Sequence, residues 1–320
     1  MELLDVQNLK TYYTTLRGPV KAVDDVSFSI EKGEALGLAG ESGCGKTTVA
    51  LSILKILPLG GKILGGQIFF EGEDITKIHE KEFRNRIRWK GISIVFQGAM
   101  NALNPVYKVG DQIIEAILLH EKISKSGARK RTEKLLETVG LEPSRADHYP
   151  HEFSGGMRQR ALIAMALACN TKLLIADEPG TALDVIVAAQ VLKLLKELKE
   201  KLNLTLIMIT HDLSIIAETC EKTAIMYAGK VAEYADTVSV FKQPLHPYTQ
   251  GLMGAFPSIK TSKTRIASIP GVPPDLLDPP IGCRFHPRCK YCMEICRTKE
   301  PEVLEVDKGH FVSCHLIGKK

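Results

Sequence analysis

The first 230 or so residues of the 320-residue chain alternate short apolar runs with longer segments whose apolar residues recur at helical spacing. Four apolar runs have the length and continuity of buried parallel strands, at residues 35–39, 92–96, 173–176 and 204–210. Residues 185–202 instead carry one apolar stripe, with lysines and glutamates on the opposite face, as an amphipathic helix does. This alternation predicts an α/β fold with a mostly parallel sheet.

Two stretches depart from this alternation. Helical spacing without a strand-like run occupies residues 98–150. Beyond Asp236 proline becomes frequent and regular periodicity fades. We therefore expect a first domain over residues 1–235, with a helical subdomain inserted at about 98–160, and a second, loop-rich domain over residues 236–320.

The composition narrows the class of protein. Hydrophobic residues make up 44% of the chain and charged residues 25%, which excludes disorder, collagen-like structure and a coiled coil for the whole chain. The 42 basic and 37 acidic residues are interspersed, and a net charge of +5 gives no reason to expect nucleic-acid binding. The most continuous apolar run, Ala161–Cys169, has nine residues, whereas a membrane-crossing helix needs about 20. Because residues 1–10 also lack the features of a signal peptide, we expect a soluble cytosolic protein that reaches a membrane only through a partner.

The segment GESGCGKT at residues 40–47 fits the pattern G-x-x-x-x-G-K-[ST]. It follows the predicted strand 35–39 and precedes a predicted helix at 48–57, so a glycine-rich turn without a ligand is disfavoured. Glycines let the backbone N–H groups surround a phosphate, Lys46 would reach the β- and γ-phosphates, and the Thr47 hydroxyl would bind Mg²⁺. The residues expected to line the nucleotide here are Gly40, Ser42, Gly43, Cys44, Gly45, Lys46, Thr47 and Thr48.

Two carboxylates follow the apolar run at 173–176. An acid at the tip of a buried strand can hold Mg²⁺ opposite a phosphate loop, which suits Asp177, and Glu178 is then placed to orient or deprotonate water. Two acids after a strand are by themselves usually a solvated turn or a helix cap. The phosphate loop earlier in the chain favours the magnesium interpretation here.

Ser154, Gly155 and Gly156 open a further predicted helix that runs through residues 161–169. Backbone N–H groups and a hydroxyl at a helix start can hold an anion, so this is a second candidate phosphate site. Taken alone, the same three residues are a helix N-cap followed by flexible glycines.

Together these segments resemble the ATP-binding subunits of ABC transporters. The resemblance rests on six motifs in order: residues 40–47, Gln97, FSGGM at 153–157, Asp177-Glu178, Ala182-Leu183-Asp184 and His211. The segments SGGMRQR (154–160), HPYTQGL (246–252) and CRFHPRC (283–289) are similar to the first of the two ATPase subunits of bacterial and archaeal dipeptide and oligopeptide importers. The resemblance implies the P-loop NTPase fold. In this family the fold forms an ABC-type nucleotide-binding domain with an inserted helical subdomain.

The resemblance also implies roles for single residues. Tyr13 would stack on adenine, although Tyr12 stands beside it, and Gln97 would sense Mg²⁺ and the attacking water. Glu178 would be the catalytic base and His211 would contact the γ-phosphate. Asp184 would cross a dimer interface, and three signature residues would bind ATP held by the other subunit: Ser154, Gly155 and Gly156.

The implied partners are a second, related or identical ATPase subunit, two transmembrane permeases and, through them, an external or periplasmic substrate-binding protein. The chain would then lie at the cytoplasmic face of the cell membrane as a peripheral subunit, with permeases docking near residues 97–111. Met157 replaces the commoner signature glutamine, as is usual in this subgroup, and Gly180 stands where the subgroup usually has threonine. The cargo and the choice between a homodimer and a heterodimer stay open.

Five of the eight cysteines crowd into the last 38 residues. Four of them have the spacing C-x5-C-x6-C-x17-C: Cys283, Cys289, Cys296 and Cys314. In a cytosolic protein such crowding indicates a metal or a cluster rather than disulfides, and four thiolates can close around a 4Fe–4S cluster or a zinc ion. The resemblance implies a 4Fe–4S cluster, with zinc as the alternative because Cys289 and Cys292 form one C-x2-C pair.

Basic residues stand among these cysteines, namely Arg284, His286, Arg288 and Arg297. We expect solvated loop charges, with an anion site as the alternative. For the whole chain, the expected function is an ATPase that energises a membrane importer, and the alternative is a soluble ABC-type ATPase in a process other than transport. Permease subunits co-purifying from solubilised membranes would separate these two hypotheses.

Overall fold

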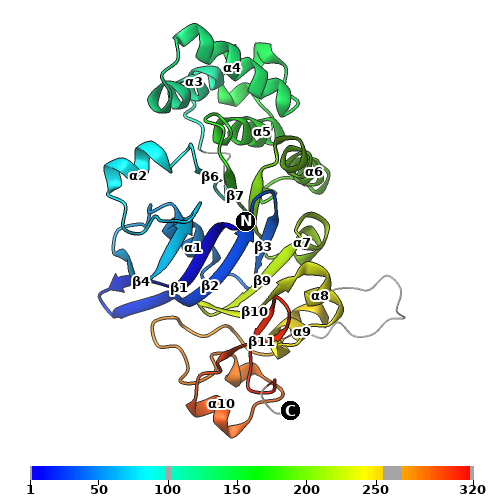
Figure 1. Ribbon diagram of the computed structural model, residues 1–320. Coiled ribbons are helices and arrows are strands. Elements are labelled where there is room, and N and C mark those ends of the chain that lie inside the picture. Colours follow the sequence, from blue (N-terminus) through cyan, green and yellow to red (C-terminus); the bar gives the residue numbers. More distant parts are fainter. Residues whose placement is uncertain (1, 99–101, 255–268, 318–320) are drawn as a thin grey trace. The chain divides into compact units, whose positions relative to one another are not determined.

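The computed structural model describes residues 2–98, 102–254 and 269–317 (Figure 1). Backbone contacts divide the chain into two compact units, each assembled from segments far apart in the sequence. Unit 1 comprises residues 31–35 and 75–209, and unit 2 comprises residues 2–30, 36–74 and 210–320.

Unit 1 is built on three parallel strands in the order β6 (Ile92–Val95), β7 (Leu173–Asp177) and β8 (Thr205–Ile209). All five residues of β7 and of β8 are buried, which explains why these strands read as continuous apolar runs rather than as alternating patterns. The sequence prediction for these three strands is confirmed to within one or two residues at each end.

The helices of unit 1 are α2 (Glu80–Arg86), α3 (Val109–His120), α4 (Lys125–Thr138), α5 (Gly155–Ala166) and α6 (Val185–Leu202), with 3-10 turns η2 (Pro143–Asp147) and η3 (Pro150–Glu152). In α6 the buried residues are Val191, Leu194, Leu195 and Leu198, which is most of the stripe that the sequence predicts. Between β6 and β7 the described residues contain helices and no strand, as the helical spacing there predicts.

Unit 2 contains an antiparallel sheet in the order β2 (Gly18–Glu31), β1 (Glu2–Thr15), β4 (Gly61–Phe70) and β5 (Glu73–Asp74). The sequence analysis did not find these strands. Buried and exposed residues do not alternate regularly along these strands. In the β1–β4 pairing, register shifts between Gln7 and Thr11 further break the alternation that marks a half-buried strand.

The second set of strands in unit 2 has the order β11 (Val303–Asp307), β12 (His310–Ser313), β10 (Lys230–Asp236), β9 (Lys222–Tyr227) and β3 (Ala35–Ala39). Only β3 and β9 are parallel, and the other pairs are antiparallel. The helices of unit 2 are α1 (Lys46–Ile53), α7 (Leu213–Thr219), α8 (Thr237–Lys242), α9 (Pro247–Gly254) and α10 (Glu294–Thr298), with the 3-10 turn η4 (His286–Arg288).

Residues beyond Asp236 are therefore richer in regular structure than the fading periodicity predicts. The elements there have only three to eight residues, too few for a pattern to repeat. None of the described helices combines the length and the apolar character that crossing a bilayer would require.

Candidate active site

The phosphate loop lies in unit 2 between β3 and α1. Gly45 caps α1 in the left-handed region, at φ 106°, and a Cβ added there would lie 2.1 Å from the backbone oxygen of Ala22. A Cβ at Gly40 would be equally close to the backbone oxygen of Met226. Only glycine fits both positions, so the loop's sequence and its backbone geometry require each other.

Lys46 begins α1 and turns back over the loop. Its side-chain Nζ donates hydrogen bonds to the backbone oxygens of Gly40 at 2.7 Å and Glu41 at 3.1 Å. Lys46 is buried, whereas Ser42, Gly43 and Thr47 are exposed at the open side of the loop. The loop therefore places an ammonium group among backbone groups beside an exposed hydroxyl, the arrangement that phosphate and Mg²⁺ binding need.

Tyr12 and Tyr13 point to opposite faces of β1. The Tyr12 hydroxyl donates to Asp24 at 2.7 Å, and burial together with this carboxylate raises the pKa of Tyr12 to about 12. The Tyr13 hydroxyl lies 3.4 Å from the hydroxyl of Thr48, in the first turn of α1. Of the two tyrosines, Tyr13 is thus the one beside the phosphate loop.

Unit 1 brings Gln97 and Glu178 together although they are 81 residues apart. The Gln97 side-chain amide donates to Glu178 Oε2 at 2.8 Å, and the Thr181 hydroxyl donates to the same oxygen at 2.9 Å. Glu178 has φ 47°, a strained conformation for a residue with a side chain, and its backbone N–H bonds to the Ile209 oxygen at the end of β8. The carboxylate is therefore held in a fixed place just after the buried Asp177.

The serine-led segment forms the start of α5. Ser154 is the N-cap, and its hydroxyl accepts the Met157 N–H at 3.3 Å. A Cβ at Gly156 would lie 2.4 Å from Cγ1 of Val187 in α6, so glycine lets α5 and α6 pack closely. Asp184 caps α6 by accepting the Val187 N–H at 2.9 Å. The helix-cap interpretation of Ser154 is therefore confirmed, and anion binding at this exposed N-cap stays a prediction.

His211 lies exposed in the short connection to α7, and Asp212 beside it caps that helix by accepting the Ser214 N–H at 2.9 Å. At Gly180, where the family resemblance expects threonine, a Cβ would lie 3.2 Å from the Cβ of Ala188. The glycine there relieves a tight contact with α6.

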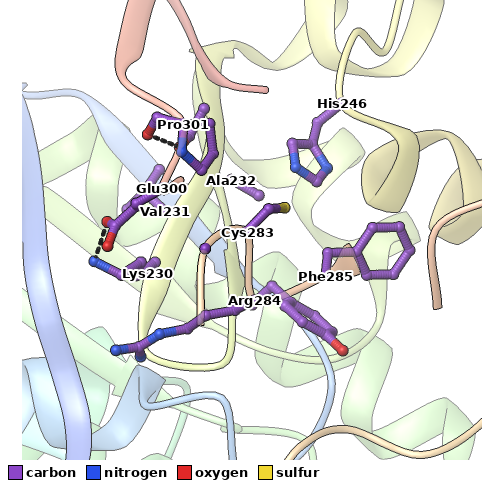
Figure 2. Close-up of a pocket in the computed structure, with 12 residues that line it drawn as sticks. Lys230, Val231, Ala232, His246, Cys283, Arg284, Phe285, Glu300 and Pro301 are labelled. Carbon is purple, nitrogen blue, oxygen red and sulfur yellow. Dashed lines mark hydrogen bonds and ion pairs between the residues drawn. The ribbon is translucent and has the colours of Figure 1, made fainter. Parts of the chain in front are cut away.

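The cysteine-rich segment gathers four thiols around one small cavity. Cys283, Cys289, Cys296 and Cys314 line it together with His246 and His315, whereas Cys292 is not among the lining residues. Burial and the neighbouring cysteines raise the pKa of the Cys283 thiol to about 12. Figure 2 shows an adjoining pocket, in which the side chains of Cys283 and His246 face each other and Lys230 pairs with Glu300 at the edge.

Two of the three arginines beside these cysteines are not solvated, contrary to expectation. Arg284 and Arg288 are only 7% and 8% exposed. Arg284 pairs with Asp24, and Arg288 pairs with Glu41 through both carboxylate oxygens. Because carboxylates already occupy both guanidinium groups, the alternative of an anion site fails as well. Arg297 does keep a largely exposed side chain.

Comparison with known proteins matches two family profiles to the chain. The profile described as ABC transporter covers residues 23–181, and the profile described as the C-terminal region of oligopeptide/dipeptide transporters covers residues 232–296. The oligopeptide transport ATP-binding protein OppD of Bacillus subtilis is 46% identical over 98% of this chain and 89% of its own length. The dipeptide transport ATP-binding protein DppD of Escherichia coli is 45% identical over 98% of this chain and 97% of its own.

The chain belongs to the ABC transporter ATPases of the oligopeptide/dipeptide type. Solved structures agree with this assignment. The ATP-binding cassette MJ0796, solved as a dimer bound to ADP and Pi, matches with a TM-score of 0.65 and 28% identity over 73% of this chain and 98% of that one. The protein CbiO1 of Clostridium perfringens matches with the same TM-score over 76% of this chain and 91% of its own. The ABC-type P-loop NTPase fold is therefore established.

Sequence reasoning missed three residues of this ATPase that touch the phosphate loop or its neighbours. Glu41 lies inside the loop, Tyr248 accepts its backbone N–H at 3.0 Å, and Arg288 pairs with its carboxylate. No local pattern marks them, because their partners are more than 200 residues away in the sequence.

Proposed function

We propose that this ABC-type ATPase hydrolyses ATP to energise a membrane importer of peptides. The hydrogen bond between Gln97 and Glu178 carries this proposal, because it joins an amide and a carboxylate that could position and deprotonate a water molecule. The relatives named as peptide transport ATP-binding proteins extend over nearly the whole chain, which disfavours a process other than transport.

Each side chain of the nucleotide site has a distinct task in this proposal. Lys46 and the loop N–H groups hold the β- and γ-phosphates, while Thr47 and Asp177 hold Mg²⁺. Glu178 takes a proton from the attacking water, and His211 contacts the γ-phosphate. Tyr13 rather than Tyr12 stacks on adenine, since the Tyr12 hydroxyl is held by Asp24. Ser42, Gly43, Cys44 and Thr48 complete the phosphate side, and Gln97 is also a Mg²⁺ contact.

A second ATPase subunit completes each site. Ser154, Gly155 and Gly156 of one chain would bind the γ-phosphate of ATP held by the phosphate loop of the other, and Asp184 would lie at the interface. ATP closes this pair and hydrolysis reopens it, which moves the permeases between two access states. The dimeric solved structure of MJ0796 is consistent with this arrangement.

The proposed assembly contains two permeases and an external substrate-binding protein, with this chain peripheral at the cytoplasmic face of the membrane. The permeases would dock near residues 97–111, of which 99–101 lie outside the described residues. Exposed apolar side chains support a docking surface there: Val106 is 69% and Tyr107 58% exposed.

We further propose that residues 1–235 act as the nucleotide-binding domain, with the helices at about 98–160 as a subdomain, and residues 236–320 as an accessory domain around the cysteines. The donor set fits a 4Fe–4S cluster held by Cys283, Cys289, Cys296 and Cys314. Burial raises the pKa of three of these thiols, and backbone hydrogen bonds from Phe285, Tyr291 and Leu316, each two residues further along the chain, partly offset that rise. Such bonds stabilise thiolate ligands.

Among the described residues, no group of three or more His, Cys, Asp or Glu side chains is arranged to hold a single metal ion. A zinc ion would need its sulfurs at about 2.3 Å, whereas a 4Fe–4S cluster would spread its four sulfurs around a larger body. The proposed cluster would link the segments of the loop-rich domain that carry its four cysteine ligands. Anaerobically purified protein should show visible sulfur-to-iron absorbance that Cys289→Ser removes and Cys292→Ser retains, whereas stoichiometric zinc would contradict it.

Glu178→Gln tests the proposed function. The amide keeps the size of the side chain but cannot accept a proton, so hydrolysis should fall at least about a hundredfold while ATP binding persists. Gel filtration with ATP should show a stable dimer of the variant. Wild-type turnover in Glu178→Gln would remove Glu178 from the proposed role. Failure to co-purify with permease subunits would favour a process other than transport.

A further inference from the structure

Glu41 is an unexpected residue for an anion-binding loop. It stands directly after Gly40, and its backbone oxygen accepts a hydrogen bond from the Lys46 ammonium. A carboxylate beside a nucleoside triphosphate would repel it unless a cation neutralises the charge. The side chain that does so comes from the far end of the chain.

Arg288 meets Glu41 with a two-pronged hydrogen bond. Its Nη2 lies 2.9 Å from Oε1 and its Nη1 lies 2.5 Å from Oε2. The third donor, Nε, bonds to the backbone oxygen of Pro270 at 2.7 Å, and the guanidinium lies 5.7 Å from the centre of the Tyr227 ring. With all three guanidinium nitrogens hydrogen-bonded and its side chain only 5% exposed, Arg288 is held firmly in place.

Tyr248 fixes the same loop residue from another direction. Its hydroxyl accepts the Glu41 backbone N–H at 3.0 Å, and the side chain is fully buried. The ring packs against Tyr227 and Phe285, with centroids 4.6 and 5.3 Å away. The backbone and the side chain of Glu41 are therefore both held from the C-terminal half of unit 2.

Arg284 supports the other end of the loop. It pairs with Asp24 and donates to the backbone oxygen of Ala228. The next residue, Gly229, donates its N–H to the Cys44 oxygen inside the loop at 2.9 Å. The two arginines lie between Cys283 and Cys289 in sequence, so the segment that carries the thiols also carries the side chain that pairs with Glu41 and the one that bonds to Ala228.

We propose that Arg288 is a positioning residue for ATP binding, which neutralises and orients Glu41 and thereby makes nucleotide affinity depend on the cysteine-rich segment. This inference rests on the proposed function in that it takes ATP as the ligand of the loop. Arg288 does not touch the nucleotide in this proposal. It acts through Glu41, and Arg284 and Tyr248 hold the surrounding backbone.

The test measures the Kd of Mg-ATP by displacement of a fluorescent ATP analogue from the full chain. Arg288→Gln leaves Glu41 charged and unpaired, so the Kd should rise about fivefold or more, while kcat at saturating ATP stays within about twofold. Arg288→Lys keeps the charge without the planar fork and should give an intermediate Kd. Arg297→Gln, an exposed arginine of the same segment, is the matched control and should bind ATP as the wild type does.

A double mutant separates positioning from general destabilisation. Glu41→Gln removes the charge that Arg288 neutralises, so adding Arg288→Gln to it should weaken binding by less than about twofold. The proposal would be overturned if the Kd of Arg288→Gln stayed within twofold of the wild-type Kd. It would also be overturned if the effects of the two substitutions on the Kd simply added. If Arg288→Gln does not fold, Arg288→Lys with and without Glu41→Gln decides the same question. A wild-type chain that binds no ATP would instead refute the proposed function.

Discussion

The phosphate loop and the cysteine-rich segment differ in how their geometry arises. In the loop, the residues themselves set much of the backbone path, since Gly40 and Gly45 adopt positive φ angles that side chains disfavour. In the cysteine-rich segment, contacts with residues that are distant in the sequence hold the irregular backbone in position. Arg284 bonds to Asp24, and Arg288 bonds to Glu41, 247 residues away.

This difference explains which side chains can be assigned a role from a motif. A loop that is shaped locally has the same chemistry wherever its pattern occurs. A side chain that is placed by remote contacts has no pattern of its own, and its charge looks solvated until its partner is known. Four substitutions can test or refine the contrast.

Gly45→Ala should have the largest effect. The new Cβ would stand 2.1 Å from the Ala22 oxygen in a backbone conformation that side chains avoid, so the loop must move. We expect ATP binding to weaken at least about a hundredfold, as for a catalytic group that is displaced by an ångström. Calorimetric titration with Mg-ATP measures it. Gly72→Ala, with φ 81° and open space around it, is the control and should cost about 1 kcal/mol of stability without changing binding.

Gly156→Ala should be the next in size. The Cβ would overlap Val187 and push α5 away from α6, so we expect hydrolysis to fall about tenfold while ATP still binds to the phosphate loop. Steady-state hydrolysis assays with a binding measurement separate the two effects. The double mutant Gly156→Ala with Val187→Ala restores space and should recover activity. No recovery would show that Gly156 acts by a route other than this packing.

Tyr248→Phe removes one buried hydroxyl and leaves the Glu41 N–H without its acceptor. Losing such a bond should lower the free energy of unfolding by about 1 to 2 kcal/mol and weaken ATP binding severalfold. Denaturant titration and nucleotide binding are the measurements. Tyr291→Phe, at a tyrosine that is 46% exposed, should leave both values unchanged. Equal effects of the two substitutions would contradict the role given to Tyr248.

The smallest effect should come from the pH dependence of the Asp24 carboxyl. Burial alone would raise its pKa, but the Tyr12 hydroxyl, Lys230 and Arg284 together lower the pKa below the ordinary 3.8. The unfolded carboxyl therefore takes up its proton first as the pH falls, so the stability from this group is present above pH 4 and is lost below it. Asp24→Asn should flatten that part of the stability curve, measured by denaturation between about pH 5 and 3. An unchanged slope would contradict the predicted shift.

Much of the fold could be predicted from the sequence. Strands β3, β6, β7 and β8 are almost fully buried and therefore read as continuous apolar runs, and helix α6 is buried along one face and therefore shows an apolar stripe. The antiparallel strands β1, β2 and β4 were not predicted, because their partly exposed faces and the register shifts between β1 and β4 blur the alternation. The elements beyond Asp236 were too short to be recognised.

The candidate site divides in the same way. Its motif residues, including Gln97, Glu178 and Ser154, were predicted from the sequence, and their roles stay predictions. The structure added the contact between Gln97 and Glu178, the position of Tyr13 beside Thr48, and a packing reason for glycine at position 156. These depend on distances between segments that no spacing along one chain specifies.

The sequence alone determined that this protein has a phosphate loop, a buried strand ending in two acids and a serine-led helix, because glycine, proline and apolar periodicity act on their own neighbourhood. Only the tertiary structure decided which groups Glu41, Tyr248, Arg284 and Arg288 contact. Their charged groups and hydroxyls find hydrogen-bond partners only when folding brings distant residues within about 3 Å, the range over which such a bond forms.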